Sequence, residues 1–190
     1  ATFRRLGTRL QGHPTTAEGL PGVRVASGSL GQGLSVAVGV AQAKKLANDN
    51  HLVYVLMGDG EQEEGQIWEA AMYAPAKNVD NIVAIVDYNK KQIDGPTDDV
   101  LSLGDLRAKY ESFGWKVWEC NGNDMQELVD TFNKIRENAH KGQSQILLAH
   151  TEMGMGVDFM MGTHKWHGVA PNDEQAANAL SQLKETLGDY

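Results

Sequence analysis

The sequence predicts an α/β fold with a mostly parallel sheet flanked by helices. Residues 51–57 and 81–87 are near-continuous apolar runs, which is typical of strands buried on both faces of a parallel sheet. Between them, residues 62–77 carry apolar side chains at helical spacing, so the three segments form a βαβ unit with a right-handed crossover. The alternation continues without a repeat or linker, so residues 1–190 are expected to form a single domain.

The remaining elements can be assigned in chain order. They are a helix over 30–47, a helix over 104–113, a strand over 115–120, a helix from 124 to about 140, a strand over 145–151, a loop over 153–168 and a helix over 172–187. Small residues fill the first of these helices, which can therefore pack closely against a neighbour. Asp124 can cap its helix, and Asp173 and Glu174 suit the dipole of the last one. Residues 1–14 resemble the end of a helix, so a further segment is expected to precede them.

Composition excludes several classes of protein. The chain is 41% hydrophobic and 22% charged with a net charge of -8, and it has no basic stripe, which disfavours nucleic acid as a partner. Its one cysteine, Cys120, is expected to be a core residue and cannot form an internal disulfide, which favours a reducing cytoplasm. No signal peptide or apolar run of membrane-spanning length is present, so no membrane association is expected.

Polar residues follow the first two predicted strands. Gly58-Asp59-Gly60 ends one strand and Asp87-Tyr88-Asn89 ends the next, so Asp59 and Asn89 should converge at one edge of a parallel sheet. Carboxylate and amide oxygens suit Mg²⁺, and the flanking glycines would let backbone N–H groups approach a phosphate. An Asp-Gly pair after a strand is more often only a turn. The second strand-end oxygen ligand is what favours a metal site.

Several stretches together resemble a known family. Gly58-Asp59-Gly60 and the later Asn89 are similar to the signature that binds thiamine diphosphate. The whole chain resembles the diphosphate-binding half of transketolases, through the stretches GHPTTAEGLPGVRVASGSLGQGLSVAVG, GDGEQEEGQIWEAA, DYNKKQIDG, FGWKV and HKWHG. The resemblance implies the thiamine-diphosphate-binding fold.

The resemblance also implies a metal site. Asp59 and Asn89 would bind Mg²⁺, or Ca²⁺ or Mn²⁺ in its place, through side-chain oxygens. The backbone carbonyl of Lys91 would be the third protein ligand. Gly60 would approach the diphosphate.

Further residues would contact the organic part of the cofactor. Gly28 and Leu30 would lie by the aminopyrimidine, and Ile93 and Met153 would line the pocket. Glu64 would lie at a subunit interface that communicates with the cofactor, where burial should raise its pKa.

Two histidines match catalytic positions of the family. His13 would face the sugar-phosphate donor, and His167 would lie near the diphosphate and the reacting hydroxyls, roles that suit imidazole near neutral pH. From the residues alone, a loop histidine before a proline is the favoured interpretation of His13. His164 and His167 have the spacing of a metal pair, but nothing else nearby supplies zinc ligands.

By resemblance, the chain is an amino-terminal transketolase subunit of the pentose phosphate pathway that lacks the family's first segment. It would transfer a two-carbon ketol unit from a ketose phosphate to an aldose phosphate, with thiamine diphosphate and Mg²⁺. A carboxy-terminal, pyrimidine-binding subunit would complete the site in a homodimer or heterotetramer. The alternatives are a related thiamine-diphosphate enzyme acting on another ketose or a 2-oxoacid, and a binding module without catalytic activity.

Overall fold

The computed structural model describes residues 2–184. Within this range the elements in chain order are η1 (Thr16–Glu18), α1 (Gln32–Leu46), β1 (Val53–Gly58), η2 (Gly60–Glu63), α2 (Gly65–Ala76), β2 (Ile82–Tyr88), β3 (Lys91–Gln92), β4 (Gly95–Pro96), α3 (Thr97–Leu101), α4 (Leu106–Phe113), β5 (Lys116–Asn121), α5 (Met125–Glu137), β6 (Gln145–His150) and α6 (Asp173–Gln182). Among these helices, none combines the length and the apolar character needed to cross a bilayer.

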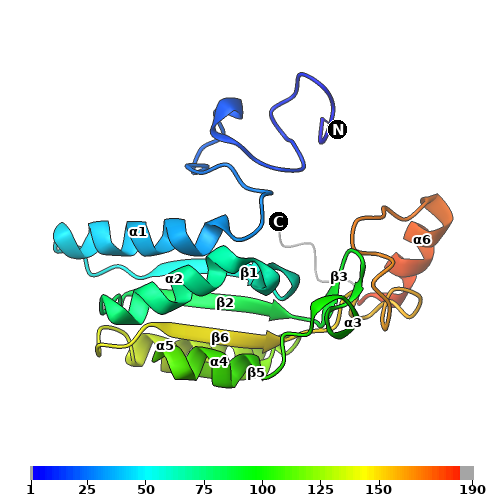
Figure 1. The fold of residues 1–190 in the computed structure, drawn as a ribbon. Coiled ribbons are helices and arrows are strands. Elements are labelled where there is room, and N and C mark those ends of the chain that lie inside the picture. The colour runs from blue at the N-terminus through cyan, green and yellow to red at the C-terminus, as the bar shows by residue number, and fades with distance from the viewer. Residues whose placement is uncertain (1, 185–190) are drawn as a thin grey trace.

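The main sheet confirms the predicted parallel architecture. Its strand order is β1-β2-β6-β5, and every neighbouring pair is parallel. Gly58 at the end of β1 is paired with Asp87, and Tyr88 at the end of β2 is paired with His150. The carboxyl ends therefore lie at one edge of the sheet, on the side where β3, α3 and α6 lie in Figure 1.

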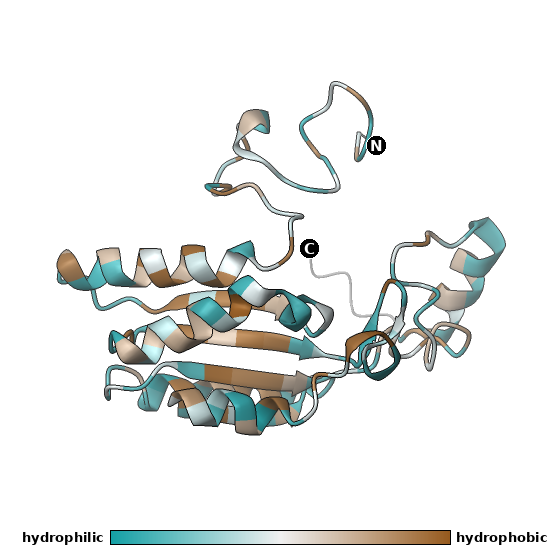
Figure 2. Cartoon of the chain, in the orientation of Figure 1, coloured by the Kyte–Doolittle hydropathy of each residue, from teal (hydrophilic) through white to brown (hydrophobic). Residues whose placement is uncertain are grey.

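Helices cover both faces of the sheet. On one face, α1, α2 and α4 contribute Leu34, Ile67 and Leu106, all buried, to a core cluster with the strands. On the other face, Ile135 of α5 packs with Leu147 of β6 in a second cluster. Figure 2 shows apolar colour along the strands, whereas the helices carry both polar and apolar colour. This burial of apolar side chains is the main favourable contribution to folding.

The structure differs from the prediction in four places. The helix predicted from residue 62 is a 3-10 turn, η2, followed by α2, because Glu64 between them is extended, with φ -72° and ψ 127°. The small β3–β4 hairpin and α3 were not predicted. Residues 2–14 form turns rather than the end of a helix. Helix α6 ends at Gln182, and the last residues of the predicted helix, 185–187, lie outside the described range.

Asp80 joins α1 to the turn before β6 at the amino ends of the strands. Its carboxylate accepts hydrogen bonds from Lys45 Nζ at 2.8 Å and from the Gly142 N–H at 3.0 Å. Burial raises the pKa of Asp80, but the hydrogen bonds from Lys45 and Gly142 together outweigh it and hold the pKa below the ordinary 3.8.

Asp80→Asn is expected to lower the free energy of unfolding at pH 7 by about 1–2 kcal/mol, because the charged hydrogen bonds are lost. A carboxylate with a lowered pKa stabilises the fold above its unfolded pKa, and that contribution disappears as the pH falls through the folded pKa. The difference from the unmodified chain should therefore shrink below about pH 3.8. Urea unfolding across this pH range measures it, and an equal loss at acid and neutral pH would contradict the assignment.

Candidate functional site

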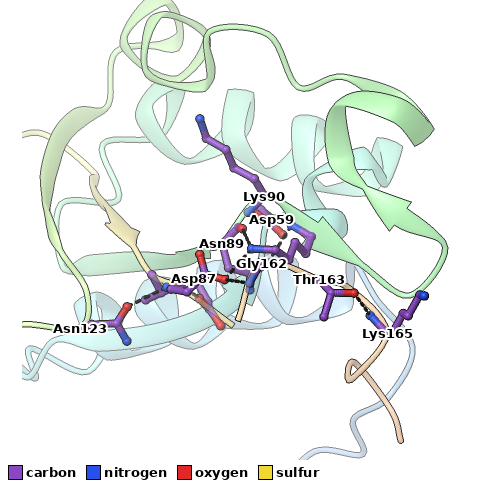
Figure 3. A network of polar contacts seen from close by, with 11 residues as sticks. Asp59, Asp87, Asn89, Lys90, Asn123, Gly162, Thr163 and Lys165 are labelled. Atoms are coloured by element: carbon purple, nitrogen blue, oxygen red, sulfur yellow. Dashed lines mark hydrogen bonds and ion pairs between the residues drawn. The ribbon is translucent and has the colours of Figure 1, made fainter. Parts of the chain in front are cut away.

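Asp59 connects the carboxyl ends of β1 and β2. It follows β1 directly and is only 1% exposed. One carboxylate oxygen accepts a hydrogen bond from the Gly60 N–H at 2.8 Å, and the other accepts from the N–H of Lys90, just after β2. Figure 3 shows Asp59, Asn89 and Lys90 grouped together. The two strand ends that the sequence predicted to converge are therefore in direct contact.

The turn after β2 brings Asn89 into this group. Lys90 adopts a left-handed conformation, with φ +61°, which turns the chain back so that its N–H faces Asp59. The side-chain oxygen of Asn89 accepts a hydrogen bond from the Lys91 N–H at 2.9 Å. Non-glycine residues seldom adopt such a φ without a functional or packing reason. The turn thus places Lys90, and with it the neighbouring Asn89, beside the buried carboxylate of Asp59.

The donor set at Asp59 fits a hard divalent cation. Burial raises the pKa of Asp59, with a contribution from the nearby charge of Asp87, even though the Lys90 and Gly60 N–H groups lower it. Within residues 2–184, no cationic side chain forms an ion pair with Asp59. No group of three or more His, Cys, Asp or Glu side chains in that range could hold a metal. One carboxylate with amide and carbonyl oxygens is instead the kind of set that Mg²⁺ shares with water and phosphate.

Glu61, which the sequence analysis did not single out, ties this edge to α1. One oxygen of its carboxylate accepts from the Gly31 N–H at the start of α1 at 2.8 Å, and the other from the Gly58 N–H at 3.2 Å. The run of acidic residues was visible in the sequence, but only the fold shows which of them faces inward. Glu64 is exposed in the single chain, so its burial at a subunit interface stays a prediction that concerns the assembled protein. It lies against Gly31, where an added Cβ would be 2.9 Å from the Glu64 Cβ.

Gln62 is fully buried beneath the same edge. Its amide donates to the Gly58 carbonyl at 3.1 Å, and its oxygen accepts from the Tyr110 hydroxyl of α4 at 2.5 Å. Burial raises the pKa of Tyr110, so its hydroxyl remains a hydrogen-bond donor at neutral pH. This buried pair fixes the end of β1 to the helical layer.

Tyr110→Phe is expected to lower the free energy of unfolding by about 1–3 kcal/mol, because the buried oxygen of Gln62 loses its donor. Phenylalanine retains the ring that packs against Trp68 and Trp115. Chemical denaturation measures the loss. An unchanged unfolding midpoint would show that the hydroxyl contributes nothing to the fold.

A cavity of about 460 Å³ opens beside Asp87 and Asn89 at the end of β2. Its lining includes Asn89, Met153 and His167, so the structure brings these three predicted residues together. The Thr151 hydroxyl donates to Asp87 and so joins the loop after β6 to the end of β2. Gly154 begins a tight turn of this loop, with φ +72°.

The other predicted residues lie elsewhere. Gly28 and Leu30 line a second cavity, of about 430 Å³, between α1 and β1. His13 packs on Gly28, where an added Cβ would lie 2.9 Å from the imidazole. Gly60, by contrast, lies beside Asp59, and a Cβ added at Gly60 would lie 2.9 Å from Gln92 Cβ. Ile93, at the turn between β3 and β4, is 67% exposed and lines neither cavity.

Comparison with known proteins gives one consistent family. Residues 1–188 match the family described as "Transketolase, thiamine diphosphate binding domain". The chain is 44% identical over 186 residues to one subunit of an apulose-4-phosphate transketolase from Phocaeicola vulgatus, covering 98% of this chain and 65% of that one. It is 36% identical over 184 residues to a 6-deoxy-6-sulfo-D-fructose transketolase subunit of a Clostridium species, covering 97% and 66% respectively.

Solved structures agree with the sequence relatives. The crystal structure of a transketolase from Campylobacter jejuni superposes with a TM-score of 0.86 at 31% identity, covering 95% of this chain and 29% of that one. A variant transketolase from Pichia stipitis gives a TM-score of 0.85 at 29% identity, covering 95% and 28%. The chain thus spans slightly less than two thirds of the length of the curated relatives described above.

Proposed function

The chain belongs to the transketolase family, and from this premise we propose that it is the amino-terminal subunit of a two-subunit transketolase. Residues 1–190 would form its diphosphate-binding domain. The names of the two relatives support this division, since each describes a subunit of a transketolase. A carboxy-terminal subunit would supply the pyrimidine-binding half of the active site, in a homodimer or heterotetramer of such pairs.

The proposed reaction moves a two-carbon ketol unit from a ketose phosphate to an aldose phosphate. The two relatives are named for ketoses that carry a phosphate or a sulfonate, which supports a donor with an anionic group. A related reaction on another ketose or on a 2-oxoacid is the alternative. Substrate profiling of the assembled complex separates them, because the donor that is cleaved differs and a 2-oxoacid donor would release carbon dioxide.

The residues at the sheet edge would hold the cofactor through its metal. Asp59, Asn89 and the Lys91 carbonyl would bind Mg²⁺, and the absence of a side chain at Gly60 would let the backbone approach the diphosphate. When bound, thiamine diphosphate supplies a nucleophilic carbon that cleaves and forms bonds next to carbonyl groups. Leu30, Ile93 and Met153 would contact its rings, and the Gly28 carbonyl would face the aminopyrimidine.

Two histidines would transfer protons to and from the sugar. His13 and His167 would exchange protons with the hydroxyl groups of the donor, since imidazole both donates and accepts near neutral pH. His167 lines the cavity next to Asn89, whereas His13 packs on Gly28 beside the other cavity. A substrate between the two cavities would meet both.

The surface around α1 is the proposed site for a partner subunit. Val36 and Val40 of α1 and Tyr54 and Leu56 of β1 are exposed apolar side chains along one cavity. Glu64 is exposed close to the start of α1. Burial of this surface by a partner would remove apolar area from water and bring Glu64 into an interface.

The observation that carries the proposal is the buried Asp59 carboxylate, which contacts the Asn89–Lys91 turn and has no counter-charge among residues 2–184. Calorimetric titration with thiamine diphosphate tests it, with and without Mg²⁺ and with and without a candidate carboxy-terminal subunit. Tight, Mg²⁺-dependent binding in the presence of that subunit is the expected result. Binding that is independent of Mg²⁺ would contradict the role of Asp59.

A further inference from the structure

A partly buried ion pair joins the two loops that border the cavity beside Asn89. Lys91 begins β3 directly after the Asn89–Lys90 turn, and its Nζ lies 2.9 Å from Glu152 Oε1 in the loop after β6. The two side chains are 14% and 36% exposed. The proposed function uses only the carbonyl of Lys91 and no atom of Glu152. The pair therefore has no role in the reaction as described so far.

Glu152 makes contacts in three directions. The oxygen that meets Lys91 also accepts a hydrogen bond from the Gly162 N–H at 2.8 Å, across the loop. Its own main-chain N–H donates to Asn123 Oδ1 at 2.7 Å, in the loop after β5. Figure 3 shows Gly162 and Asn123 around Asp87 and Asn89. Glu152 thus connects the metal-ligand turn, the loop after β5 and the far part of its own loop.

The segment held at Gly162 leads to His167 and is braced internally. Trp166 Nε1 donates to the Phe159 carbonyl at 2.9 Å, and the two rings pack edge to face with their centroids 5.3 Å apart. The His167 N–H donates to the His164 carbonyl at 2.9 Å. The Phe159–Trp166 contact spans Gly162, and the hydrogen bond between His164 and His167 extends these contacts to His167. Holding Gly162 therefore also holds His167.

The charge of Lys91 matters as well as its contact. Glu152 lines the cavity together with Asp87 and Asn89. A carboxylate that faces this cavity would repel an anionic ligand, and the repulsion is strong where water is partly excluded. The ammonium group at 2.9 Å cancels most of this charge. Without it, Glu152 would oppose a diphosphate.

We propose that Lys91 and Glu152 are positioning residues of the active site. Their ion pair sets the spacing between the metal-ligand turn and the loop that carries Met153 and His167. Lys91 also neutralises the charge of the Glu152 carboxylate, which would otherwise repel an anionic ligand. The inference rests on the proposed function only where cofactor binding is the readout.

Binding of thiamine diphosphate with Mg²⁺, measured by calorimetry on the assembled complex, tests the neutralisation. Lys91→Met is expected to weaken the affinity about tenfold, which corresponds to about 1.4 kcal/mol. The double variant Lys91→Met with Glu152→Gln should bind more tightly than Lys91→Met alone, because the unpaired charge is gone, and Lys91→Arg should recover most of the loss. A double variant no better than Lys91→Met would overturn the neutralisation.

Lys45→Met is the matched control. Lys45 forms a pair with Asp80 at a similar distance, 2.8 Å, at the amino ends of the strands. Its loss should lower stability but leave the cofactor affinity unchanged. A loss of affinity equal to that of Lys91→Met would assign the effect to general destabilisation and overturn the inference.

Hydrogen exchange of the cofactor-free chain tests the positioning independently. Lys91→Met is expected to raise the exchange rate of the Gly162 amide at least about fivefold, because the loop is released locally. Lys45→Met should leave that amide unchanged. Unchanged exchange in Lys91→Met would show that the pair does not position the loop. If the unmodified complex fails to bind the cofactor, the proposed function fails, but the exchange rates still decide the role of the pair.

Discussion

Replacing Asp59 with alanine is expected to abolish Mg²⁺-dependent binding of thiamine diphosphate, with a loss of affinity greater than about 100-fold. Asp59 is the only charged ligand in the proposed metal set, and it is 1% exposed, so a water molecule from bulk solvent cannot easily take its place. Its removal also leaves the Gly60 and Lys90 N–H groups without their acceptor. Both effects act at the point where β1 and β2 meet.

The pH dependence of binding gives a second readout of Asp59. Because burial raises its pKa above the ordinary 3.8, protons compete with the metal at a higher pH than for an exposed aspartate. The affinity for Mg²⁺ should therefore rise as the pH rises through that pKa.

The control for Asp59→Ala is Asp94→Ala, which removes an exposed aspartate from the β3–β4 turn. Calorimetry on Asp59→Ala and Asp94→Ala measures the affinity for thiamine diphosphate in the presence of Mg²⁺. Retained affinity in Asp59→Ala would show that Asp59 is only a turn residue.

Gly154→Ala is expected to lower the free energy of unfolding by about 2–5 kcal/mol, as the sum of backbone strain and overpacking. The backbone at Gly154 has φ +72°, which an L side chain rarely adopts. An added Cβ would lie 2.5 Å from Met160 Cβ and 3.1 Å from the Met160 carbonyl carbon. A side-chain movement alone cannot relieve the second contact, so the loop itself must move.

The variant Gly162→Ala distinguishes backbone strain from overpacking. Gly162 lies in the same loop with φ +73°, but an added Cβ would meet no atom within 4 Å. The substitution keeps the N–H that binds Glu152. Its cost should therefore be the strain alone, about 1–2 kcal/mol. Urea unfolding of both variants measures the difference, and equal losses would rule out overpacking at Gly154.

The sequence predicted the sheet well because buried parallel strands have a strong signature. The apolar runs of β1 and β2 led to strands that the structure places within two residues of the predicted bounds. Asp124 caps α5 as predicted, with its carboxylate accepting from the N–H groups of Gln126 and Glu127. The β3–β4 hairpin has two residues in each strand, too few for any periodicity to be visible.

The site was less predictable because its contacts join distant parts of the chain. Asp59 and Asn89 could be placed together, since adjacent parallel strands end at the same edge. Glu61 could not, because its role depends on the position of Gly31 across the fold. The ion pair of Lys91 and Glu152 was missed for the same reason, since no local pattern relates β3 to the loop after β6.

The order of the strands has a consequence for the kinetics of folding. Strand β6, the last strand among residues 2–184, lies between β2 and β5, and Val83 pairs with Gln145 across a long stretch of chain. Such distant pairings form slowly, because loop closure costs entropy before the contacts compensate for it. The cavity next to Asn89 includes the loop after β6, so it can form only once β6 has inserted. A ligand bound there is therefore expected to slow unfolding without accelerating refolding.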